Sequence, residues 1–110
     1  MDEPIRTINW ISDAKDMAHY TNPTINCARF APISSQPYVP STEYIIAGCY
    51  DGLRNQPVKC FDMRTGAIVH QFKFVQTSCL SLDVSADGKF CVMGDITGVF
   101  HFDDINYNEE

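Results

Sequence analysis

The sequence predicts an all-β protein made of two antiparallel β-sheet units, and three observations support this. Short runs of alternating apolar and polar residues are separated by turns rich in Gly, Pro, Asn and Asp. The run Ile45-Ile46-Ala47-Gly48-Cys49-Tyr50-Asp51-Gly52, followed by Phe61-Asp62, has a weaker copy at 90–98, followed by Phe102-Asp103. A spacing of about 40 to 46 residues indicates a structural repeat. No segment has a helical apolar period over a helix length.

The first unit is expected to form one four-stranded sheet with its strands in chain order. Each run alternates, and the turns between runs carry Asn-Pro, Asp-Gly or Thr-Gly. Two irregular inserts, 33–43 and 53–57, interrupt the unit. The expected strands are 24–30, 44–50, 58–62 and 67–73.

The segment 4–13 alternates around Ile8 and Trp10, which predicts one more strand. Two placements are open for it. It is either the third strand of a preceding unit or a strand that pairs with the far end of the protein.

The second unit is more compact, and its turn Ala86-Asp87-Gly88-Lys89 is a strong hairpin signal. Its expected strands are 78–84, 90–93 and 99–102. The tail after them supplies no outer strand, so 99–102 is expected to be an unpaired edge. We expect this edge to self-associate or to pair with residues 4–10.

These repeats resemble the WD40 family. Ala18-His19 stands where the family has Gly-His, Ala31-Pro32 where it has Ser-Pro, and Phe61-Asp62 where it has Trp-Asp. The resemblance covers about residues 18–105 and implies blades of a β-propeller. It divides the chain into an N-terminal strand or partial blade (1–17), one blade (18–75) and a second blade without an outer strand (76–110). Two blades do not close a ring, so the chain is expected to be part of a longer protein, to assemble with other chains, or to remain an open pair of sheets.

The resemblance also implies a structural hydrogen bond between His19 and Asp51. Phe61 replaces the Trp that ends this hydrogen-bond chain in the family, so only the shortened pair is expected. In the second unit Thr97 replaces the turn Asp, and no such pair is expected there.

The composition and net charge of the chain limit the classes of partner that it is expected to bind. The 110 residues carry a formal net charge of −6 and a pI of about 4.8, and no basic stripe is present. This argues against nucleic acid and anionic membranes as partners. The first residues, Met-Asp-Glu-Pro, do not have the basic and apolar regions typical of a signal peptide, and no apolar run reaches the length of a membrane span. The cysteines are odd in number and never spaced Cys-x-x-Cys, so reduced thiols and an intracellular location are expected, in the cytoplasm or the nucleus: Cys27, Cys49, Cys60, Cys79 and Cys91.

Catalytic chemistry is not indicated. The histidines and cysteines lack the close spacing of zinc ligands, the aspartates fall mostly in turns, and no Gly-rich phosphate loop precedes a helix. We therefore expect neither an enzyme nor a cofactor.

The sequence favours a non-enzymatic protein–protein interaction scaffold. Candidate interaction residues are Tyr38 and Val39 in the loop 33–43, with Arg54 and Arg64. The alternative is a structural subunit that completes a propeller with another chain. Two weaker alternatives are a small open β-barrel and a substrate receptor of a cullin-type ubiquitin ligase, because Phe61-Asp62-Met63-Arg64 resembles the Trp-Asp-x-Arg ending of such receptors.

Overall fold

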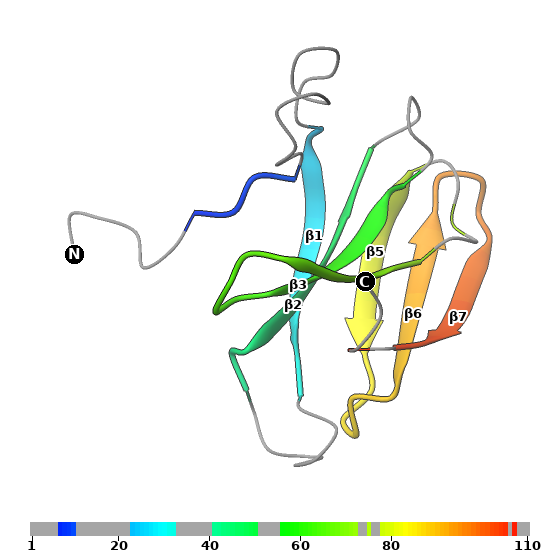
Figure 1. The fold of residues 1–110 in the computed structure, drawn as a ribbon. Coiled ribbons are helices and arrows are strands. Elements are labelled where there is room, and N and C mark those ends of the chain that lie inside the picture. The colour runs from blue at the N-terminus through cyan, green and yellow to red at the C-terminus, as the bar shows by residue number, and fades with distance from the viewer. Residues whose placement is uncertain are drawn as a thin grey trace.

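A computed structural model of the chain describes residues 7–10, 23–32, 41–50, 56–72, 75, 78–105 and 107, and their strands form two antiparallel sheets (Figure 1). The first sheet is four-stranded, in the order β1-β2-β3-β4. Its strands are β1 (Ile25–Ala31), β2 (Tyr44–Cys49), β3 (Val58–Asp62) and β4 (Ile68–Gln71). The predicted all-β class and the four-stranded sheet in chain order are confirmed, and no helix occurs in the described residues.

The second sheet is three-stranded, in the order β5-β6-β7. Its strands are β5 (Cys79–Val84), β6 (Phe90–Asp95) and β7 (Phe100–Asp104). Within the described residues β7 pairs only with β6, so it is an edge strand, as expected.

Residues 7–10 do not form the strand that the alternation of the segment 4–13 predicts, and the rest of that segment lies outside the described residues. Trp10 is buried against Phe61 of the first sheet, with ring centroids 5.5 Å apart. Residues 7–10 therefore do not pair with the β7 edge, and self-association of that edge, the other expectation, stays a prediction. Burial of the large indole on an apolar sheet surface provides more stabilisation than a short edge ladder in water.

The predicted hairpin between β5 and β6 is confirmed. Gly88 has φ of 73°, a left-handed conformation that glycine adopts without steric cost, and its amide donates to the Ser85 carbonyl at 2.9 Å. The Asp87 carboxylate accepts from the Ser85 hydroxyl at 2.6 Å and from the Lys89 amide at 3.0 Å. These hydrogen bonds pair the polar groups of the turn with one another.

The two sheets face each other, with β1 and β2 packed on β5, and the main core lies between them (Figure 1). A smaller cluster of Trp10, Ala47, Cys49 and Phe61 lies on the opposite, outer face of the first sheet. All five cysteines are free thiols, as expected, and only Cys27 is partly exposed. The main core consists of Ala31, Ile46, Val58, Cys60, Phe72, Val75, Cys79, Leu82, Cys91, Met93 and Ile105.

The second sheet repeats the strand register of the first. Gly48 in β2 lies opposite Cys27 of β1 and Val58 of β3, and Gly94 in β6 lies opposite Ser81 of β5 and Phe100 of β7. A register shift also occurs at the same place in both sheets, between Ile25 and Cys27 and between Cys79 and Ser81. The two sheets are therefore structural repeats that place Gly94 at the position of Gly48.

The two aromatic–Asp pairs are not equivalent in this repeat. Phe102 lies opposite Val92, which corresponds to Ile46, and Ile46 lies opposite Cys60 rather than Phe61. Phe102 thus corresponds to Cys60 in the structure, whereas the sequence repeat aligns Phe102 with the next residue, Phe61. Because side chains alternate between the faces of a strand, this slip places Phe61 and Phe102 on different faces. Phe61 is 4% exposed and Phe102 is 78% exposed.

Candidate interaction surface

Several residues singled out from the sequence lie outside the described residues, so their roles stay predictions. They include the expected structural pair and most of the candidate interaction residues: His19, Asp51, Tyr38, Val39 and Arg54.

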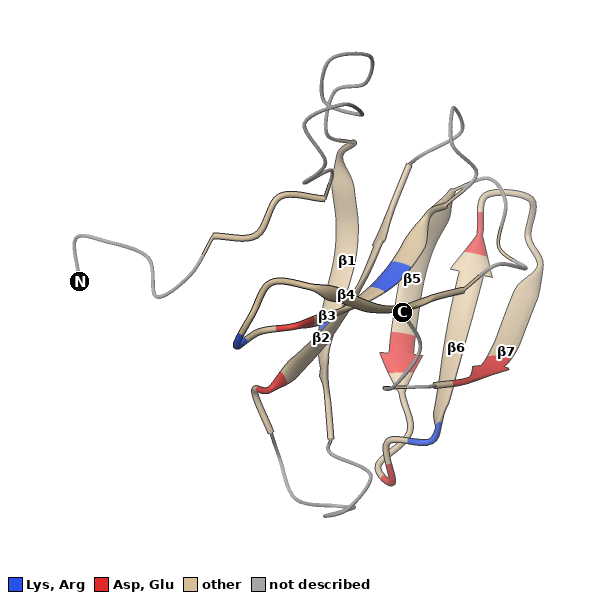
Figure 2. Cartoon of the chain, viewed as in Figure 1, with Lys and Arg blue, Asp and Glu red and all other residues tan. Residues whose placement is uncertain are grey.

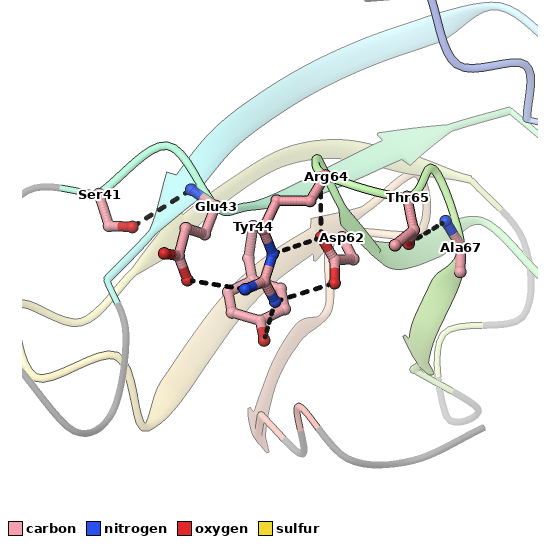
Figure 3. Close-up of polar contacts among 7 residues, drawn as sticks. All are labelled: Ser41, Glu43, Tyr44, Asp62, Arg64, Thr65 and Ala67. Carbon is pink, nitrogen blue, oxygen red and sulfur yellow. Dashed lines mark hydrogen bonds and ion pairs between the residues drawn. The ribbon is translucent and has the colours of Figure 1, made fainter.

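Arg64 is described and lies in the turn between β3 and β4 (Figure 3). Its guanidinium donates from Nε to Asp62 Oδ1 and from Nη2 to Asp62 Oδ2, both at 3.1 Å, a bidentate geometry. These side-chain bonds from Arg64 hold the pKa of the Asp62 carboxyl below its usual range. Glu43 and the Tyr44 hydroxyl flank the same guanidinium at 3.8 and 3.4 Å. Arg64 therefore stabilises its own turn, whatever else it binds.

The second sheet has an exposed apolar surface on the side away from the first sheet. Val92 lies opposite Phe102, and Gly94 lies opposite Phe100, so these four residues share one face of the sheet. Phe90 joins them from the start of β6, and the exposed fractions of Phe90 and Phe100 are 51% and 72%. We call Phe90, Val92, Gly94, Phe100 and Phe102 the phenylalanine face.

Charges lie near the ends of the strands around this face (Figure 2). By register, Asp83 and Asp104 lie on the same side as the phenylalanine face, opposite Val92 and Phe90 respectively. A shallow hollow of about 210 Å³ lies beside Phe90, Phe102 and Asp83. An apolar centre with a polar rim is the usual anatomy of a protein–protein interface. The acidic residues of these strands are Asp83, Asp95, Asp103 and Asp104.

A second apolar surface lies on the outer face of the first sheet. An open groove of about 350 Å³ runs beside Trp10, and its walls are mostly apolar. The indole N–H of Trp10 has no hydrogen-bond partner among the described residues. Ile25 on the groove wall is 48% exposed. The lining residues are Ile8, Asn9, Trp10, Pro23, Ile25, Ala28, Ile45, Ala47, Phe61 and Met63.

A His–Asp pair that was not expected in the second unit lies at the β6–β7 turn. His101 Nε2 lies 2.7 Å from Asp95 Oδ2, and Asp95 Oδ1 accepts from the Thr97 hydroxyl at 2.6 Å. These bonds hold the pKa of Asp95 far below its usual range. The hydrogen bond from Thr97 has the largest effect, and that from His101 the second largest. The signal was present in the sequence as Asp-x-Thr-Gly followed by a His in the next strand.

The geometry of this pair is structural. Thr97 and His101 both bind the Asp95 carboxylate rather than each other, so the histidine does not activate the hydroxyl as a base would. Asp95 Oδ1 also accepts the Thr97 and Val99 amides, at 2.8 and 3.1 Å. The carboxylate therefore closes the turn.

Three of the buried thiols have raised pKa values. Burial raises the pKa of the Cys60, Cys79 and Cys91 thiols to about 12, which disfavours the nucleophilic thiolate. In the described ranges no three His, Cys, Asp or Glu side chains are placed to hold a metal ion together. The same ranges contain no helix that is long and apolar enough to cross a bilayer.

Comparison of the chain with models of known protein families and with curated proteins gives no match. The functional proposal is therefore based on the surfaces of the chain itself.

Proposed function

We propose that the chain is a non-enzymatic protein–protein interaction module built from WD40-like blades, and that the phenylalanine face binds its partner. The proposal rests on the observation that Phe90, Phe100 and Phe102 are exposed together on one three-stranded sheet. Single exposed apolar residues are ordinary, whereas contiguous ones mark binding sites.

The energetics favour this role. Full burial of a Phe side chain is worth about 1.5–3 kcal/mol relative to exposure. Aromatic anchors near the centre of an interface carry most of its binding energy.

A second candidate is a structural subunit that completes a propeller with another chain. The observation in its favour is that both outer faces of the sheet pair are apolar, the groove beside Trp10 on one side and the phenylalanine face on the other. In repeat architectures each unit buries its faces against its neighbours. The reduced thiols favour an intracellular location for either function.

The proposal is tested by capturing partners from cells that express the chain, with wild-type protein and the variant Phe102→Glu as baits. Ile96→Glu is the matched control, because Ile96 is 55% exposed but lies in the β6–β7 turn. We expect a partner that wild-type and Ile96→Glu retain and Phe102→Glu loses.

Binding is then measured with the purified partner. Phe102→Glu should raise the Kd about tenfold or more, since a buried anchor is replaced by a charge. The proposal is overturned if no partner depends on Phe102, or if both variants weaken binding equally.

A further inference from the structure

We infer that the partner of the phenylalanine face is a second copy of this chain, which docks with the outer face of its own first sheet, so that copies stack head to tail. This inference rests on the proposed function, since it names the partner of the same face.

The first support is that the phenylalanine face corresponds to a face that is already covered by a sheet. On the inner face of the first sheet, Ile46, Val58 and Cys60 are wholly buried in the core that lies between the two sheets. Their counterparts by strand register are Val92, Phe100 and Phe102. The second sheet thus repeats the pattern of a covered face, yet its phenylalanines are exposed.

The second support is a pair of equivalent glycines. A Cβ atom on Gly48 would lie 2.6 Å from Cys79 Sγ, because the facing sheet approaches closely there. Among the described residues, a Cβ atom on Gly94 would meet Ser81 Oγ at 3.0 Å and Phe100 Cε1 at 3.9 Å, both from its own sheet. Gly94 therefore offers the same close approach to a facing sheet that Gly48 gives to Cys79.

The outer face of the first sheet supplies the matching residue. Ile25 occupies in β1 the position that Cys79 occupies in β5, since each immediately precedes the register shift. Ile25 is half exposed and lines the groove. Repetition of the packing between the two sheets places Ile25 of the second copy over Gly94 of the first.

Charge also fits this arrangement. Within the chain, Arg29 Nε lies 3.9 Å from Asp83 Oδ1 and links the two sheets at their exposed edge. Arg29 and Asp83 are counterparts in the repeat, since they pair with Ile46 and Val92 respectively. The stacked arrangement therefore brings Arg29 of the second copy to Asp83 of the first. Such an exposed pair adds little affinity but favours the correct register.

The test uses the purified full chain and sedimentation velocity over a wide concentration range. A head-to-tail contact leaves one free surface on each end, so wild-type mass should rise past that of a dimer, toward a ring or a filament. Phe102→Glu and Ile25→Glu should each be monomeric where wild-type is assembled, whereas Ile96→Glu should assemble normally. Phe100→Glu serves as a second variant of the phenylalanine face, and a cooperative urea transition shows that each variant is folded.

Mixing the two monomeric variants is the decisive measurement. Phe102→Glu keeps an intact first-sheet surface and Ile25→Glu keeps an intact phenylalanine face, so the mixture should form a one-to-one dimer. The inference is overturned if wild-type stays monomeric at every concentration, or if the mixture gives no dimer. If a different protein is then captured in a Phe102-dependent way, the proposed function still holds. If neither self-assembly nor Phe102-dependent capture is observed, the inference and the proposed function are both overturned.

Discussion

The Sγ atom of Cys79 in β5 lies 2.6 Å from the position that a Cβ atom on Gly48 of β2 would occupy. Cys27 Sγ lies 2.9 Å from the same position and 3.9 Å from Cys79 Sγ. The two sheets therefore approach closely at a residue without a side chain, and the sulfur atoms of Cys27 and Cys79 lie where a side chain would be.

Replacement of Gly48 by alanine should lower the free energy of unfolding by about 1–3 kcal/mol, because the new methyl group overpacks the contact with Cys79. Urea denaturation followed by tryptophan fluorescence measures the change. The matched control is Gly94→Ala, where the nearest atom is the Ser81 hydroxyl at 3.0 Å. That variant should stay within about 0.5 kcal/mol of wild-type when both are measured at a concentration at which the chain is monomeric, as substitutions outside the core do. Equal effects at both glycines would contradict the packing described for Gly48.

Trp10 should be a main determinant of stability even though it lies outside the sheets. Its ring packs edge-on against Phe61, and its carbonyl accepts a hydrogen bond from Lys59 Nζ at 3.3 Å. Trp10→Ala should cost about 3–5 kcal/mol, the usual range for a buried aromatic. Trp10→Phe should cost clearly less, because it keeps an aromatic ring on Phe61. Circular dichroism in urea tests both variants, and an unchanged midpoint for Trp10→Ala would refute this role of residues 7–10.

The buried thiols should be inert in the folded chain. With a pKa of about 12, only about one part in 10⁵ of the Cys60, Cys79 and Cys91 thiols is ionised at pH 7. A thiol-specific reagent such as DTNB should therefore label these positions slowly, at a rate that rises with urea as the chain unfolds. Mass spectrometry of labelled peptides identifies each site. Rapid labelling of Cys60 in the absence of urea would contradict the burial described above.

Stability should fall in acid. The pKa values of Asp62 and Asp95 are lowered in the folded chain, chiefly by hydrogen bonds from Arg64 and Thr97 respectively. Below about pH 4, the ordinary aspartate value, the unfolded chain binds protons at these sites before the folded chain does. Their contribution is therefore complete at neutral pH and is lost as pH falls through the folded pKa values.

Urea midpoints at pH 7 and pH 3 measure this loss. Asp95→Asn should be less stable than wild-type at pH 7 and should lose less on acidification, because one titrating group is gone. A larger acid sensitivity in Asp95→Asn than in wild-type would contradict the assignment.

Local sequence was enough to predict the strands and turns. The alternation of β1 to β4 and the Asp87-Gly88 turn act between near neighbours, so no distant contact was needed to recognise them. The reduced state of the thiols also followed from cysteine count and spacing alone. The edge position of β7 among the described strands was also predicted from the sequence.

Strand register and long-range packing decided which face each side chain occupies and which distant residues come into contact. The sequence aligns Phe61 with Phe102, but the ladders displace them by one residue, and a displacement of one residue exchanges the faces of a strand. Phe61 is consequently buried under Trp10, and Phe102 contributes to the exposed face. The closeness of His101 to Asp95 likewise depends on how β7 returns beside β6. Alternation specifies that a strand has two faces, but only the pairing of distant segments specifies which face each side chain takes, because that choice depends on the surface buried against the neighbouring sheet.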